Sequence, residues 1–277
     1  MHSNSDYAAH VAVSLTVLAS GSKGNCSVIA SSGTRLLIDA GLSCREICRR
    51  LALSSLSPES LDGVLITHEH ADHVSGLYVF AKRFAVPVYM TEATHRAWTR
   101  QYKNSNGDRV KAERVETFQS GHKFSVGDIE ITPFTIPHDA ADPVGFTFRA
   151  EGIKLGFVTD LGYMPSSIKS HLKGCDGVLL ESNHDLEMLR VGPYPWAVKQ
   201  RVMSRVGHLS NDALAEFLST DYDGSAAFLI LAHLSEANNH PEIARTAAER
   251  ALAERLTLLH NRVVLARQDE PLAAVTL

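Results

Sequence analysis

Residues 66–73 read Ile66-Thr67-His68-Glu69-His70-Ala71-Asp72-His73 and directly follow the apolar run Gly63-Val64-Leu65. Such a run is typical of a buried strand, so the polar cluster stands at a strand end. His68 and His70 are two positions apart and point to the same side of an extended chain. Imidazole binds zinc, copper, iron and nickel, and carboxylate suits harder ions such as manganese. We therefore predict a metal site at this loop.

Asp72 and His73 follow where the chain turns into a helix, so they can face a second ion. One loop can in this way supply two ligands to each of two neighbouring metals. A single His-x-His pair is a weak indication, because polar side chains are common in solvated loops. A solvated loop does not explain why this segment holds almost nothing but possible ligands.

The composition is that of a globular protein: 277 residues, 44% hydrophobic and 21% charged. The formal net charge of -4 argues against a strongly basic nucleic-acid-binding surface, although it leaves room for a local basic groove. The four cysteines form no Cys-x-x-Cys pair, so we expect reduced thiols and a cytoplasmic protein. We find no signal peptide or membrane-spanning segment and expect no membrane partner.

Strand and helix signals alternate along the chain. Strands are predicted at 13–18, 26–30, 35–38, 63–66, 86–90, 154–159, 177–180, 226–231 and 262–266, with further β signal from 114 to 148. Helices are predicted at 43–53, 74–84, 91–102, 195–204, 211–218 and 242–256. The first of these helices opens on a capping-box signature, Ser43 with Glu46 three residues further on.

This order of elements favours an α/β (α+β) fold in which two sheets pack face to face with helices outside. No linker, low-complexity stretch or internal repeat interrupts the chain. We therefore predict one domain over residues 11–277, preceded by a flexible N-terminal segment at residues 1–10.

Three further candidate ligands stand at predicted strand ends: His138, Asp160 and His233. Loops at strand ends are where rigid scaffolds place their chemistry. Taken alone, each could instead cap a loop or satisfy backbone groups. Together with residues 66–73 they suggest two neighbouring ions, and the carboxylate of Asp160 could bridge both. The first ion would take His68, His70 and His138, and the second would take Asp72, His73 and His233.

Several segments resemble the metallo-β-lactamase superfold and, within it, the WalJ/YycJ-type members. These segments are Leu18–Asn25, Asp39–Ser43, Thr67–His73, Glu181–Asp185, Arg190–Trp196, Gly207–Asn211 and Leu231–Ser235. The resemblance implies a four-layer αββα sandwich with a dinuclear site built from strand ends. The WalJ/YycJ-type proteins are regarded as metal-dependent phosphodiesterases or DNA exonucleases, so the resemblance implies a hydrolase that acts on nucleic acid, with DNA as the expected substrate.

The same resemblance suggests roles for residues that are not metal ligands. Asp39 matches an early aspartate that orients the ligand loop. His208 is expected to contact the phosphate or protonate the leaving oxygen, and the alternative is that it caps the following helix. His184, with Ser182 and Asn183, either lines the pocket or fixes its own loop.

The expected mechanism uses two divalent ions. Ions about 3.5–4 Å apart lower the pKa of a bridging water and clamp both oxygens of an in-line displacement. We predict that a metal-bridging hydroxide attacks the phosphorus of a phosphodiester, with Asp72, Asp160 and His208 as the catalytic residues. The sequence leaves the metal open between zinc, manganese and iron, and leaves the oligomeric state open.

Two other functions fit the same residues. A dinuclear site on this scaffold could hydrolyse a small phosphodiester, a lactone or a thioester, because fold alone does not choose the substrate. A non-catalytic, metal-stabilised binding module is the third possibility.

A basic groove is one further hypothesis. Lys199, Arg201 and Arg205 fall on one predicted helix after Trp196 and could line a groove for a nucleic-acid strand, with Trp196 and Tyr194 as stacking surfaces. The alternative, which the sequence slightly favours, is an ordinary solvated helix face with its aromatic residues in the core.

Overall fold

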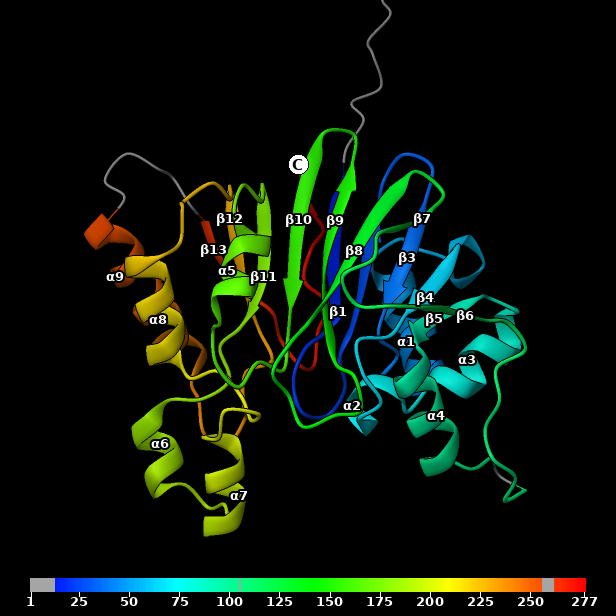
Figure 1. The fold of residues 1–277 in the computed structure, drawn as a ribbon, viewed down its shortest axis with the longest axis horizontal. Coiled ribbons are helices and arrows are strands. Elements are labelled where there is room, and N and C mark those ends of the chain that lie inside the picture. The colour runs from blue at the N-terminus through cyan, green and yellow to red at the C-terminus, as the bar shows by residue number, and fades with distance from the viewer. Residues whose placement is uncertain (1–12, 105, 256–261) are drawn as a thin grey trace, which may run out of the picture.

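The computed structural model describes residues 13–104, 106–255 and 262–277. These residues form two seven-stranded sheets packed face to face, with helices on both outer faces (Figure 1). The predicted four-layer αββα sandwich is confirmed. The flexible segment expected at residues 1–10 lies outside the described residues, and the single domain over 11–277 stays a prediction. No helix in the described ranges is long and apolar enough to cross a membrane.

The first sheet comes from the N-terminal half of the chain and a short C-terminal strand. Its strands are β1 (Ser14–Ala19), β2 (Cys26–Ala30), β3 (Arg35–Ile38), β4 (Gly63–Leu65), β5 (Val88–Thr91), β6 (Val115–Phe118) and β14 (Val275–Thr276). Strands β3 to β6 run parallel, and β14, β1, β2 and β3 are antiparallel to one another in turn. Its helices are α1 (Cys44–Leu53), η1 (Pro58–Ser60), α2 (Ala71–Val74), α3 (Leu77–Phe84) and α4 (Glu92–Gln101).

The second sheet follows in the chain. Its strands are β7 (Phe124–Val126), β8 (Ile129–Thr135), β9 (Val144–Ala150), β10 (Ile153–Val158), β11 (Gly177–Glu181), β12 (Phe228–Ala232) and β13 (Arg262–Leu265). Strands β10 to β13 run parallel, and β8 shares their direction because β9 is antiparallel to both β8 and β10. Its helices are α5 (Ser166–Leu172), α6 (Leu186–Val191), α7 (Trp196–Val202), α8 (Asn211–Thr220) and α9 (Pro241–Arg255).

Three apolar layers hold the sandwich together, one between the sheets and one under each set of helices. Neighbouring residues of one strand contribute to different apolar layers, because successive side chains point to opposite faces of a sheet. In β3, Leu36 and Ile38 face the other sheet, whereas Leu37 faces the helices of the first sheet. Burial on both faces explains why these strands read as continuous apolar runs.

Most predicted elements are confirmed within a few residues, and the helix predicted over 74–84 is observed from Leu77 to Phe84 as α3, with a separate short helix, α2, before it. The two helices are separated at Ser75 and Gly76. The amide of Gly76 donates to the carbonyl of Ala40, and a Cβ at Gly76 would lie 2.0 Å from the carbonyl oxygen of Leu42. The helix breaks here because the chain approaches this neighbouring loop closely. Helices α5 and α6 were not predicted; they have only seven and six residues.

Helix α1 is fixed to the first sheet through a buried arginine. Its N-cap is the predicted Ser43, whose hydroxyl accepts from the amide of Glu46. The guanidinium of Arg50 donates to the carbonyl of Leu18 on β1 and to that of Gln268, at 2.9 and 2.6 Å. The carboxylate of Glu46 also accepts from Arg50, at 2.7 Å. Glu46 therefore holds the arginine that attaches the helix to the sheet.

We predict that Glu46→Gln destabilises the fold in a pH-dependent way. Hydrogen bonds from Arg49, opposed by burial and supported by Arg50, lower the pKa of Glu46 from 4.5 to about 2. Its contribution is therefore present above about pH 4.5 and is lost as the pH falls towards 2. Urea unfolding should show a cost of about 1 kcal/mol at pH 7 that shrinks below pH 4.5.

The matched control is Glu92→Gln, because Glu92 pairs with Arg96 at an exposed position where ion pairs contribute little. A cost of Glu46→Gln that stays constant from pH 7 to pH 3 would contradict the role of this carboxylate.

Candidate metal centre

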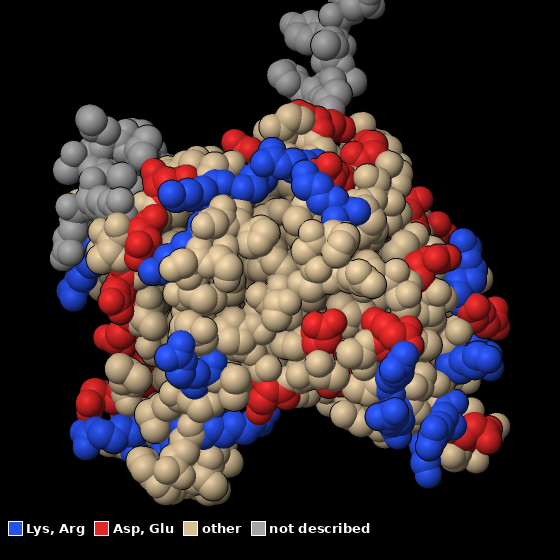
Figure 2. Space-filling model, in the orientation of Figure 1, with Lys and Arg blue, Asp and Glu red and all other residues tan. Residues whose placement is uncertain are grey.

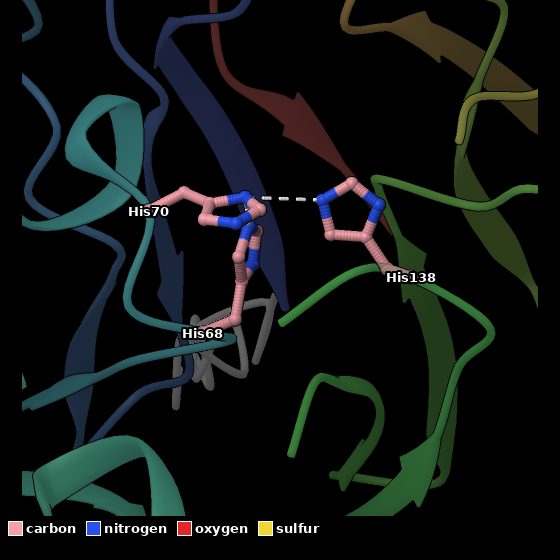
Figure 3. Close-up of side chains that lie close together, drawn as sticks. All are labelled: His68, His70 and His138. Carbon is pink, nitrogen blue, oxygen red and sulfur yellow. Dashed lines mark hydrogen bonds between the residues drawn. The ribbon is translucent and has the colours of Figure 1, made fainter. Parts of the chain in front are cut away.

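The carboxyl ends of the parallel strands bring the predicted ligands together between the two sheets. His68 and His70 follow β4 in the first sheet, and His138 follows β8 in the second. Their rings point toward one another (Figure 3). The Nδ1 atom of His70 lies 3.1 Å from Nε2 of His68 and 3.1 Å from Nε2 of His138.

A second cluster lies beside the first. It contains Asp72 and His73 from α2, Asp160 after β10 and His233 after β12. Nε2 of His73 lies 3.5 Å from Asp72 and 3.2 Å from Asp160, and Nε2 of His233 lies 3.4 Å from Asp72. Ligand atoms on one tetrahedral zinc ion lie about 3.3 Å apart, given bonds of 2.0–2.1 Å. Both clusters therefore have the spacing of a metal site.

Asp160 stands between the two clusters. Its Oδ1 lies 3.9 Å from Nε2 of His138, and its Oδ2 lies 3.2 Å from Nε2 of His73. The residue is 1% exposed, and Oδ2 has no hydrogen-bond partner. A buried carboxylate oxygen that accepts no hydrogen bond is costly in free energy unless positive charge lies close to it. A cation at this position would satisfy it, so the residues present fit a divalent metal.

Three residues of this region hold a left-handed backbone conformation. They are Asp39 after β3, Asp160 and His233, with φ values of 60°, 58° and 55°. This conformation is uncommon for residues other than glycine and costs of order 1–3 kcal/mol each. Strain of this kind gathers at functional sites, where it aims a side chain that a relaxed turn would point elsewhere.

The Nδ1 atoms of three histidines make hydrogen bonds on the side of the ring away from the cluster. Nδ1 of His73 lies 2.8 Å from Asp39, and Nδ1 of His138 lies 3.1 Å from the carbonyl oxygen of Gly207. Nδ1 of His233 lies 2.8 Å from Glu181. Each of these oxygens accepts a hydrogen bond from the Nδ1–H group, which leaves Nε2 of each ring for a ligand.

The two clusters differ in their electrostatics. Burial lowers the pKa values of His68 and His138, so both imidazoles are neutral, the form that binds metal. Burial also acts to lower the pKa of His73, but Asp160, Asp39 and Asp72 outweigh it and raise that pKa well above its usual value. The pKa of His233 is raised in the same way, chiefly by Asp160. Protons on these two rings balance the carboxylates, and a cation can replace them.

Glu181 is a residue that the sequence analysis did not assign to the site. It ends β11, is fully buried, and its Oε1 lies 2.8 Å from Nδ1 of both His208 and His233. Its Oε2 accepts from the amides of Leu161 and Leu209. Burial acts to raise the pKa of Glu181, but His208 and His233 lower it to about 2. One carboxylate thus orients a candidate ligand and the predicted catalytic histidine together.

His208 lies at the mouth of the second cluster, with its side chain 18% exposed. It does not cap α8, because the cap is formed by the hydroxyl of Ser210. Glu181 occupies its Nδ1, so Nε2 is the nitrogen available to a substrate. Asn25, also not predicted, reaches the site from the loop after β1, with Nδ2 3.1 Å from Nε2 of His73. Its sequence signals are its place in a glycine-rich turn and at the end of the matching segment Leu18–Asn25.

His184, Ser182 and Asn183 lie behind the site. Nδ2 of Asn183 donates to the carbonyl of His233, and Oγ of Ser182 donates to Asn211. His184 is 1% exposed, and burial lowers its pKa to about 4. Of the two roles considered for this run, the geometry supports fixing the loop rather than lining a pocket.

Neither interpretation of the basic segment after Trp196 matches the structure in full. Lys199 is buried, and its Nζ donates to the carbonyl of Arg190. Arg205 lies beyond the end of α7 and stacks on the ring of Tyr163 at 4.2 Å. These side chains therefore do not form one solvated helix face. Trp196 is exposed rather than part of the core.

Comparison with known proteins agrees with this geometry. A family profile, the Beta-lactamase superfamily domain, matches residues 34–234. The crystal structure of the metallo-beta-lactamase fold protein YhfI from Bacillus subtilis is similar with a TM-score of 0.67 at 16% identity, over 93% of this chain and 99% of that chain. Fold and profile together define the chain as a member of the metallo-β-lactamase superfamily.

Two relatives narrow the assignment. Exodeoxyribonuclease YycJ from Bacillus anthracis is 38% identical over 87% of this chain and 89% of its own length. Exodeoxyribonuclease WalJ from Streptococcus pneumoniae is 37% identical over 86% of this chain and 88% of its own length. Within the superfamily, the chain is a hydrolase of the family that contains these two relatives.

We predict that Gly41→Ala disturbs the metal centre. A Cβ at Gly41 would lie 1.7 Å from the carbonyl oxygen of Asp72, so the main chain of α2 must move. We expect a loss of about 1–3 kcal/mol in stability and a lower content of divalent metal, measured by urea unfolding and elemental analysis. The control is Gly33→Ala, where the new Cβ meets only the flexible carboxylate of Asp128, at 3.3 Å. Wild-type metal content in Gly41→Ala would contradict this close packing.

Proposed function

We propose that this protein is a divalent-metal-dependent phosphodiesterase that removes nucleotides from DNA as an exonuclease. The observation that carries the proposal is the convergence of His and Asp side chains from both sheets on the buried carboxylate of Asp160, whose Oδ2 accepts no hydrogen bond and lies 3.2 Å from Nε2 of His73. The names of the relatives from Bacillus anthracis and Streptococcus pneumoniae support DNA as the substrate.

The proposal includes two metal ions. The first ion would be held by the imidazoles of His68, His70 and His138. The second would be held by Asp72, His73 and His233, and Asp160 would be shared between the two ions. Mixed imidazole and carboxylate donors admit zinc, manganese or iron. The four cysteines are free thiols, which supports the proposed cytoplasmic location.

When bound, two divalent ions would supply an activated water near neutral pH and neutralise charge on the phosphoryl oxygens. The protein's own residues prepare the site for this. Asp39 and Glu181 bind Nδ1 of His73 and His233, which directs Nε2 of each ring toward the proposed metal position. Burial acts to lower the pKa of His208, but the carboxylate of Glu181 raises that pKa by more, which favours the protonated imidazolium. In that form Nε2 of His208 donates to a phosphate or to the leaving oxygen.

We predict that Asp160→Ala abolishes cleavage without unfolding the chain. The variant loses the carboxylate shared by both sets, so rates with single-stranded DNA and with bis-p-nitrophenyl phosphate should fall roughly a thousandfold or more. His233→Ala is expected to behave in the same way. Rates are measured with each metal restored, and circular dichroism checks the fold.

Asp269→Ala serves as the control, because it removes an exposed carboxylate outside the clusters. Retained activity in Asp160→Ala would refute the bridging role. Hydrolysis of a lactone or thioester, with no cleavage of either phosphodiester by the wild type, would favour the alternative substrates.

We also predict that added salt raises KM for an oligonucleotide but has little effect on the cleavage of bis-p-nitrophenyl phosphate. A strand that releases counterions on binding should show a KM that rises with salt, with a logarithmic slope of about 0.7 per neutralised phosphate. Cleavage of bis-p-nitrophenyl phosphate has no such counterion atmosphere and should respond weakly. The measurement is KM for an end-labelled oligonucleotide over a series of salt concentrations. A flat response with the oligonucleotide would argue for a small phosphodiester as the natural substrate.

A further inference from the structure

Residues 186–206, here called the α6–α7 arm, project below the second sheet beside its strand ends (Figure 1). The arm contains α6, α7 and the segment after α7. It is braced internally, since Nζ of Lys199 on α7 donates to the carbonyl of Arg190 on α6 at 2.8 Å. None of its side chains belongs to the candidate metal clusters.

Most of the exposed large apolar side chains of the molecule gather on this arm. Nine such side chains are exposed in the described part of the chain, and six lie on the arm. They are Leu186, Val191, Trp196, Val198, Met203 and Val206. Trp196 is 64% exposed, whereas the other tryptophan, Trp98, is 1% exposed. A concentration of apolar surface of this kind marks a binding site.

The arm is also basic in a chain that is acidic overall. Residues 186–206 contain four Lys or Arg side chains and one acidic side chain, Glu187, although the net charge of the whole chain is -4. In Figure 2 the lobe at the lower left, where Figure 1 places α6 and α7, is tan at its tip with Lys and Arg side chains beside it. This surface therefore suits a polyanion that also has apolar faces.

Each arginine of the arm has a partner that leaves donors free. Arg190 pairs with Glu187 at a fully solvated position, and Arg201 pairs with Asp139. Arg205 lies over the ring of Tyr163. A guanidinium has five N–H donors, and exposed ion pairs are weak, so these groups can still contact phosphate.

The arm leads directly to the metal centre. The amide of Asp139 donates to the carbonyl of Val206, and Nδ1 of His138 lies 3.1 Å from the carbonyl oxygen of Gly207. The amide of His208 donates to the carbonyl of Val202 at the end of α7. A strand bound along the arm is thus placed beside a proposed ligand and the proposed acid.

We propose that the α6–α7 arm is a stacking platform for the bases of the single-stranded DNA substrate, with Trp196 as the stacking ring and Arg190 and Arg201 beside the backbone. The proposal rests on the proposed nuclease function and deepens it. Proteins that hold single strands combine aromatic faces with a basic groove, and the bases of a duplex are stacked on each other and unavailable. A protein partner would use the apolar residues but has no need of a segment with four basic residues and a single acidic one.

The two tryptophans give a direct test. The metal-loaded protein is titrated with an oligo(dT) whose phosphorothioate links resist cleavage, and tryptophan fluorescence is followed. Stacking on Trp196 should quench the exposed component of the emission, and buried Trp98 should not respond. Trp196→Ala should remove the quenching. It should also weaken binding, followed by anisotropy of a labelled strand, by roughly 5- to 150-fold, as expected for loss of one stacked base.

Three controls separate stacking from other effects. Trp196→Phe keeps a ring and should retain most of the affinity. Leu53→Ala removes a side chain of similar exposure from α1 and should bind as the wild type does. A strand of abasic deoxyribose phosphates should bind the wild type and Trp196→Ala equally, because it offers charge without bases.

Wild-type affinity of Trp196→Ala for oligo(dT) would overturn the proposal. So would a change from dimer to monomer in light scattering with unchanged affinity, because the arm would then be a surface for a second copy of the chain. Failure of the nuclease function is distinguished by the wild type itself, which would cleave no DNA whatever its fluorescence shows.

Discussion

The site depends on keeping carboxylates charged between two apolar sheets. Asp39, Asp160 and Glu181 are each almost completely buried, and an unpaired charge in such a place costs several kcal/mol. Asp39 is compensated by Thr67 and His73, and Glu181 by two amides and two imidazoles. Asp160 faces the imidazoles of His73 and His233, and its Oδ2, which accepts no hydrogen bond, is directed at the place where the ligand atoms converge. The other features of the centre follow from this demand for positive charge.

Much of the site could be predicted because residue type and order carry the chemistry. The spacing of His68, His70, Asp72 and His73 is local, so it is visible within eight positions of the sequence. His138, Asp160 and His233 each follow a strand, and parallel strands in a two-sheet fold bring their carboxyl ends together. Most strands could also be predicted, because strands buried on both faces read as continuous apolar runs.

The missed features depend on distant neighbours. A buried Glu at a strand end looks the same in sequence whether or not it binds histidines, and the partners of Glu181 lie 27 and 52 positions further along the chain. Helical spacing placed Lys199 on α7 but could not show that the main chain of α6 lies against it. Nor could it show that Trp196 is exposed, because a large aromatic residue is usually taken as core. In each case the deciding contact comes from another element.

The candidate ligands are divided between the sheets, and this division has a consequence for assembly of the molecule. His68, His70, Asp72 and His73 come from the first sheet, and His138, Asp160 and His233 from the second. Neither half holds a full coordination set, so the centre is complete only once the halves have docked. An ion bound there would contact ligands from both sheets, so its binding would stabilise the docked arrangement against separation of the two sheets.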